Sequence, residues 1–196
     1  MTHEASGHTL VELLIVTALV CVVAAIGLPR LRAGLDDAKT RTAAFYVSSR
    51  FALARTLSAQ RNANVAFRFE PADSGFRVRA IVDTNGNGVR SAEIQSGIDV
   101  PILPDERLDH LFSGVQYGFV PGARLIDGTS VSPGDDPIRF GRSDMLTFSP
   151  SGTATSGTVY IRSRRTNSQF AITVLGATGR TRITRFDAAN RRWIAP

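Results

Sequence analysis

The sequence is poor in cysteine and lysine and lacks the common catalytic signatures. Among 196 residues there is one Cys, and Lys39 is the only lysine among 23 basic residues. A single Cys excludes an internal disulfide. The Gly-x-Ser-x-Gly, His-Glu-x-x-His and Walker patterns are absent as well, so no motif favours an enzyme and we expect no cofactor. With 43% hydrophobic and 20% charged residues, the chain is neither disordered nor collagen-like.

The basic surplus is local. The net charge is +6, but residues 70–150 sum to −5, whereas residues 8–69 sum to +5 and residues 151–196 to +7. Almost all of the cations are arginines, which bind phosphates and carboxylates in a bidentate way. The end of the chain is therefore the first place to look for an anion-binding surface.

The longest apolar run extends from Leu10 to Leu28 and contains one charged residue. As a helix these nineteen residues span roughly 28 Å, close to the thickness of a membrane core. A cleaved signal peptide, a buried core helix and a plain anchor are the alternatives. A signal peptide needs a basic start, and no Lys or Arg precedes Arg30.

Glu12 is the unusual residue of this run. A carboxylate near the start of a membrane span costs about 2 to 3.5 kcal/mol and is usually retained for a partner. We therefore expect a positive group to neutralise Glu12.

The sequence Gly7-His8-Thr9-Leu10-Val11-Glu12, followed by the apolar run and Pro29, resembles the start of type IV pilins and type II secretion pseudopilins. The resemblance implies that prepilin peptidase cuts between Gly7 and His8 and that the new amino group of His8 is methylated. It also implies that Glu12 meets the N-terminus of a neighbouring subunit in a filament. By resemblance the protein is a single-pass protein of the bacterial inner membrane with an exported C-terminal part. The cations after the span, counted by the positive-inside rule, favour the opposite orientation.

After Pro29, which is expected to kink the helix, the helical pattern continues to Asn62. Apolar or small residues recur every three or four positions and predict the face that packs on a globular domain. They are Leu31, Leu35, Ala38, Thr42, Phe45, Ser49, Leu53 and Leu57.

Beyond Ala63 the sequence changes to short alternating runs separated by Gly- and Pro-containing turns, which is typical of antiparallel sheets. The expected strands are 65–69, 76–82, 100–103, 115–120, 145–149, 158–162, 170–175 and 180–186. The predicted fold is therefore α+β, with a long N-terminal helix packed on an antiparallel β-sandwich-like domain. The expected parts are a leader (1–7), a transmembrane helix (8–29), an amphipathic continuation (30–62) and an exported β-rich domain (63–196).

Two further stretches, 49–67 and 148–180, resemble the GspH/FimT branch of this superfamily. That resemblance implies a non-enzymatic minor pilin or pseudopilin, with other pilins, prepilin peptidase and the membrane as partners. Two hypotheses concern its exported domain, namely DNA capture for natural transformation and type II secretion without DNA binding. A membrane-anchored β-sandwich binding protein is the alternative from another class.

The DNA hypothesis rests on arginines near the C-terminus, where Gly179-Arg180-Thr181-Arg182 resembles a motif of FimT-like proteins. Arginines on adjacent strands can bind phosphates, although a solvated polar face is the competing interpretation. The candidate residues are Arg162, Arg164, Arg165, Arg180, Arg182 and Arg185.

The stretch beginning Asp83-Thr84-Asn85-Gly86-Asn87 starts like a calcium loop, with oxygen ligands at alternate positions. Its end does not fit, because Ile94 stands where the bidentate carboxylate belongs. Asp, Asn and Gly are also what a tight loop between strands uses. The sequence therefore favours a structural loop over a metal site at Asp83, Asn85 and Asn87.

Overall fold

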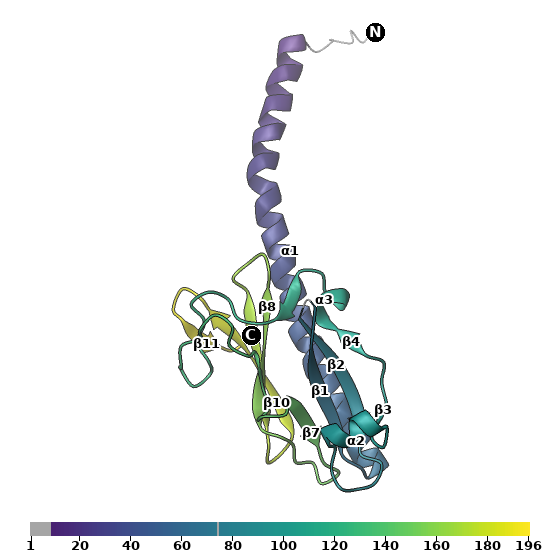
Figure 1. The fold of residues 1–196 in the computed structure, drawn as a ribbon. Coiled ribbons are helices and arrows are strands. Elements are labelled where there is room, and N and C mark those ends of the chain that lie inside the picture. The colour runs from purple at the N-terminus through teal and green to yellow at the C-terminus, as the bar shows by residue number, and fades with distance from the viewer. Residues whose placement is uncertain (1–8, 74) are drawn as a thin grey trace, which may run out of the picture. The chain divides into compact units, whose positions relative to one another are not determined.

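The structure, a computed structural model, describes residues 9–73 and 75–196 and divides into two compact units (Figure 1). The first unit is Met1–Leu35 and the second is Asp36–Pro196. Helix α1 (Leu10–Arg61) contributes residues to both units. Gly7 and His8, the expected cleavage and methylation positions, lie outside the described residues.

In the first unit, α1 is an exposed apolar helix. An 18-residue window near its N-terminus has a mean hydropathy of 2.7 and no buried residue, so this part is long and apolar enough to cross a membrane. Pro29 lies inside the helix without ending it. The missing proline amide removes one hydrogen bond there, while the helical backbone continues as the sequence pattern predicts.

In the second unit, α1 buries a different face from the predicted one. Phe45 and Leu53 of the predicted stripe are 46% and 37% exposed, and Leu31 and Leu35, which belong to the first unit, are 66% and 60% exposed. The buried positions lie about one residue further along, and are Asp36, Thr40, Ala43, Ala44, Val47, Phe51, Ala54 and Ser58. Most of these side chains are small, which lets the helix approach the sheets closely. The predicted face was wrong because periodicity of large apolar residues does not reveal a contact made by alanines and one phenylalanine.

Two antiparallel sheets complete the second unit. Sheet A has the order β3-β2-β1-β7, with β4 also pairing β2. Its strands are β1 (Val65–Ala72), β2 (Gly75–Val82), β3 (Val100–Pro101), β4 (Glu106–Arg107) and β7 (Met145–Phe148). Sheet B has the order β11-β10-β9-β8-β5, with β6 also pairing β8. Its strands are β5 (Val115–Tyr117), β6 (Ile138–Arg139), β8 (Gly157–Ser163), β9 (Gln169–Leu175), β10 (Arg180–Asp187) and β11 (Arg192–Ile194).

One core joins the helix and the two sheets. Phe51 of α1 lies with its ring centroid 5.5 Å from that of Phe67 in sheet A and 6.2 Å from that of Phe140. Sheet B contributes the inward-facing residues of β8 and β9, such as Ile161 and Ile172, to the same cluster. The predicted α+β fold, a helix packed on antiparallel sheets, is confirmed within this unit.

The middle of the chain departs most from the prediction. Helices α2 (Ser91–Ser96) and α3 (Leu108–Leu111) and the short strands β4 and β6 were not predicted there, nor was β11 near the C-terminus. The segment 118–137 covers the outer face of sheet B, where a separate small core contains Val120, Ala123 and Phe186. Such short elements carry too few residues for a period to appear in the sequence.

Candidate functional sites

Glu12 lies in the first turn of α1, next to a residue that caps the helix. The Glu12 amide donates a hydrogen bond to Thr9 Oγ1 at 3.2 Å, the bond expected of an N-cap Thr three residues before a Glu. The start of α1 thus has an acidic residue at the positive end of the helix dipole. The motif Thr9-Leu10-Val11-Glu12 therefore has a local structural role in addition to any role in assembly.

The six candidate arginines do not form one surface. Arg162 is paired with Gln169 on β9, whereas Arg180 is paired with Leu175. Six residues along β9 correspond to about 20 Å, so Arg180 and Arg162 lie at opposite ends of sheet B. Arg182 lies near Arg180, and the other three lie at the Arg162 end of the sheet.

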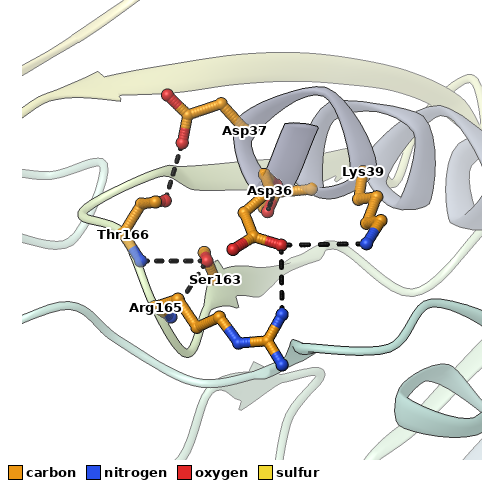
Figure 2. A network of polar contacts seen from close by, with 7 residues as sticks. Asp36, Asp37, Lys39, Ser163, Arg165 and Thr166 are labelled. Carbon is orange, nitrogen blue, oxygen red and sulfur yellow. Dashed lines mark hydrogen bonds and ion pairs between the residues drawn. The ribbon is translucent and has the colours of Figure 1, made fainter. Parts of the chain in front are cut away.

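Arg164 and Arg165 take part in contacts that hold the β8–β9 turn. Arg164 Nε donates a hydrogen bond to Gln116 Oε1. Arg165 Nη1 lies 3.4 Å from Oδ1 of Asp36 on α1, which Lys39 also approaches at 3.8 Å (Figure 2). These contacts give both arginines a structural function.

The same turn has a second attachment to α1. Thr166 Oγ1 donates to Asp37 Oδ1 at 2.6 Å, and the Ser163 hydroxyl accepts the amides of Arg165 and Thr166 (Figure 2). Asp36 is only 8% exposed, so removing its partner leaves a buried carboxylate. The turn is therefore fixed to the helix by two neighbouring aspartates.

Arg185 lies on a different face from Arg162. It is paired with Phe170, whose side chain belongs to the core shared with α1. Together with Asp37 and Arg41 of α1, Arg185 lines a hollow of about 260 Å³. Arg185 is thus separated from both Arg162 and Arg180.

Arg180 instead shares a groove with Arg55 of α1. The groove has a volume of about 620 Å³, and no acidic residue lines it. Neither arginine forms an ion pair within the described part of the chain. Its lining residues are Ala52, Arg55, Thr56, Ala59, Pro150, Ser151, Gly152, Gly179, Arg180 and Thr181.

Gly179 allows this arrangement. Its φ is +59°, and a Cβ placed there would lie 2.9 Å from the Gly152 carbonyl oxygen and 3.3 Å from Arg55 Cδ. A side chain would therefore push Arg55 away from the turn that begins β10. Sequence reasoning found Gly179 and Arg180 but missed Arg55, because residues 124 positions apart are brought together only by the fold.

The Asp83 loop is held by its own hydrogen bonds. Asp83 is 2% exposed, and its carboxylate accepts the amides of Gly86 and Gly88 and the side chain of Asn64 at 2.7 to 2.9 Å. Burial alone would raise the pKa of Asp83, but these hydrogen bonds outweigh it and lower the pKa below its usual value.

The other two weak metal candidates serve the same loop. Asn85 Oδ1 accepts the Asn87 amide, and Asn87 Nδ2 donates to Glu93. Within residues 9–73 and 75–196, no group of three or more His, Cys, Asp and Glu residues is placed to hold a metal ion. The geometry supports the structural interpretation of this loop.

Comparison with known proteins gives a likeness in structure. No protein-family model matches the chain, and no curated protein matches it. Among solved structures, the chain is similar to the minor pseudopilin EpsH from the Type 2 Secretion System of Vibrio cholerae. The two have 16% sequence identity and a TM-score of 0.46, over 74% of this chain and 95% of that chain.

Proposed function

We propose that this chain is a non-enzymatic filament subunit of the minor pilin or pseudopilin class, assembled through the first part of α1. The observation that carries the proposal is the exposed apolar helix with Glu12 in its first turn. Such a surface is not stable in water and needs a membrane or other helices around it. A membrane would surround the helix before assembly, and the helices of neighbouring subunits would surround it in a filament.

Glu12 explains why the subunit leaves the membrane. Its carboxylate is costly in the hydrocarbon core, and a neighbour's positive N-terminus offsets that cost strongly in a medium of low dielectric constant. Cleavage after Gly7 creates that positive group at His8, which would then be methylated. In this scheme Pro29 is the point at which the helix loosens, and the second unit is exported from the inner membrane.

The test is the mass of the mature N-terminus, isolated from the native host. We expect a chain that starts at a methylated His8. A chain with intact Met1, or one cut near Gly27, would contradict the proposal and favour a plain anchor or a signal peptide.

Assembly gives a second measurement. Replacing Glu12 with Gln removes the charge that the neighbour pairs with, so the variant should be cleaved normally but be reduced at least several-fold in the sheared filament fraction. Glu93→Gln, which changes a carboxylate of the second unit, is the matched control. Equal incorporation of both variants would refute the role of Glu12.

The groove between Arg55 and Arg180 favours DNA binding over protein export as the task of the second unit. Two arginines, two Thr residues and a Ser residue surround it without a lining acid, which suits a phosphate backbone. The bound segment would be short, because Arg162, Arg164 and Arg165 lie at the other end of sheet B. A type II secretion subunit that does not bind DNA is the alternative.

Salt dependence of binding tests this assignment. The full chain in a non-ionic detergent is titrated with double-stranded DNA at several salt concentrations, and log K should fall linearly with log salt. Arg55→Ala and Arg180→Ala should each reduce the slope by about 1. Arg142→Ala removes an exposed charge elsewhere and should leave the slope within error. Binding that is absent, or unchanged in both groove variants, would favour the alternative.

A further inference from the structure

A second groove lies on the outer face of sheet B, beside the segment that covers this face. The segment is anchored through aromatic contacts, with the ring centroids of Phe119 and Tyr160 4.7 Å apart. Trp193 Nε1 donates to the Arg124 carbonyl at 2.9 Å. The groove at the margin of this segment has a volume of about 490 Å³.

Three polar side chains form a row across the strands next to this groove. Arg162 on β8 is paired with Gln116 on β5 and with Gln169 on β9. Directly paired residues point to the same face of a sheet, so the three side chains are neighbours. Gln116 and Arg162 line the groove.

Arg162 is held at this place but has no acceptor. Its Nε is inaccessible to solvent and has no hydrogen-bond partner, and Arg162 forms no ion pair with a described residue. The backbone of Gly118 lies against the guanidinium, since a Cβ at Gly118 would be 3.2 Å from Arg162 Nε. A partly buried arginine without an anion is an expensive arrangement.

The side-chain amide of the neighbouring Gln169 also has a donor without an acceptor. Gln169 is fully buried, and its Oε1 accepts the Val120 amide at 2.9 Å, while its Nε2 has no acceptor. Two adjacent donors therefore lack an oxygen. Buried donors are almost always satisfied in native proteins, by the protein, by water or by a ligand.

A ligand in the groove meets Arg162, which lines it, but not Gln169, which does not. The walls of the groove indicate which ligand suits the charge of Arg162. Arg162 and Asp135 are the only charged residues among those that line it. Asp135 already accepts the Ser132 amide at 2.9 Å and faces Arg139. The groove thus offers one unpaired positive charge among apolar, Pro and Gly residues, and its acid would repel a polyanion such as DNA.

We propose that this groove binds an extended segment of a partner protein, with one Asp or Glu carboxylate of that segment on Arg162. A carboxylate matches the planar guanidinium in geometry as well as charge, and the apolar walls accept the residues on either side. This proposal does not depend on assembly into a filament or on DNA binding by the other groove.

The test uses the full chain, labelled with ¹⁵N, in non-ionic detergent. The probe is an acetylated, amidated hexapeptide of Ala, Val and Pro with one central Glu. We expect it to shift the side-chain Nε resonance of Arg162, which lines the groove. Replacing the central Glu by Gln should weaken binding roughly 10- to 100-fold, as expected for one charge-assisted hydrogen-bonded pair.

Substitutions locate the site. Arg162→Gln should reduce affinity for the Glu peptide by the same factor, and Arg162→Lys should restore part of it. Arg182→Gln, which removes a charge from the other end of the same sheet, is the matched control. Thermal unfolding of each variant shows whether the fold is retained, and the Lys variant provides the comparison if the Gln variant unfolds.

Three results would overturn the proposal. They are equal binding of the Glu and Gln peptides, tighter binding of a Gln peptide with a free C-terminal carboxylate, and displacement of the Glu peptide by duplex DNA in a manner that requires Arg162. A failure of DNA binding in the Arg55 and Arg180 variants would leave this result unaffected, so the two proposals fail separately.

Discussion

At the scale of single residues, Asp83 shows how a motif with metal-ligand chemistry serves a loop instead. The carboxylate is buried and accepts three hydrogen bonds from Asn64, Gly86 and Gly88. These donors occupy the oxygens that an ion would need. Sequence identifies the right residue types here, but whether their oxygens face an ion or the loop's own amides depends on backbone dihedrals that a motif does not specify.

The lowered pKa of Asp83 makes its contribution dependent on pH. The unfolded chain has a carboxyl pKa of about 3.9, and the folded value is lower. The stabilisation is therefore complete above about pH 4 and is lost as the pH falls through the folded pKa. Asp83→Asn should cost roughly 1 to 3 kcal/mol of unfolding free energy at pH 7, and the difference from wild type should shrink below pH 4.

Chemical denaturation between pH 2.5 and 7 measures that difference. Asp73→Asn, at an exposed position, is the control and should change little at any pH. A wild-type advantage over Asp83→Asn that stays constant down to pH 2.5 would show that the charge of Asp83 does not stabilise the loop.

Arg55 is the clearest case of a residue that the sequence could not assign. Glu12 can be predicted to matter because a lone carboxylate in an apolar run is costly whatever the fold. Arg55 gains its importance from Gly179, which meets it only in the folded second unit. Chemistry that depends on neighbours along the chain is predictable, and chemistry that depends on strand register is not.

At the scale of elements, the sequence predicts the extent of helix α1 correctly but predicts the wrong buried face. The break at Asn62 is found one residue after the helix ends, where Asn62 adopts a φ of +51°. The buried face is rotated from the predicted one because three alanines form much of the contact. Leu31, Leu35, Phe45 and Leu53 remain exposed as a result.

The orientation of α1 gives a prediction with a built-in control. Phe51 is 1% exposed and contacts three aromatic rings, whereas Leu53 is 37% exposed. Phe51→Ala should reduce the free energy of unfolding by about 3 to 5 kcal/mol. Leu53→Ala should change it by about 0.5 kcal/mol or less, as at surface positions generally. Urea denaturation of both variants compares them directly. A larger loss of unfolding free energy for Leu53→Ala would show that the face predicted from sequence is the buried one.

In sheet B, too, the sequence predicts where single strands lie but not how they are paired. Alternation predicts β8, β9 and β10 within one or two residues of their observed bounds. It also predicts that Arg162 and Arg164 share one strand face, whereas β8 ends at Ser163. The separation of Arg162 from Arg180 follows from the register of β9 between them, which no property of either strand sets by itself.

At the scale of the whole molecule, charge and burial divide the chain at the same place. Residues 1–35 contain two arginines and two glutamates, so the entire net charge of +6 belongs to residues 36–196. The core also starts at Asp36, and none of the described residues before it is buried. One unit is therefore adapted to an apolar surrounding and the other to water.

This division predicts that the second unit folds without the apolar helix. A chain of residues 30–196 retains every buried residue described, so its unfolding midpoint should lie within roughly 2 °C of that of the full chain in detergent, corresponding to a change below about 0.5 kcal/mol. Circular dichroism at 222 nm follows the melt, and near-ultraviolet spectra report the packing of the aromatic core. A truncated chain that melts broadly would show that residues before Arg30 stabilise the second unit.

A truncated chain that melts cooperatively should still bind DNA and the Glu peptide with the affinities of the full chain, because both grooves are lined only by residues after Asp36. It should lose its association with membranes, because it lacks the apolar part of α1.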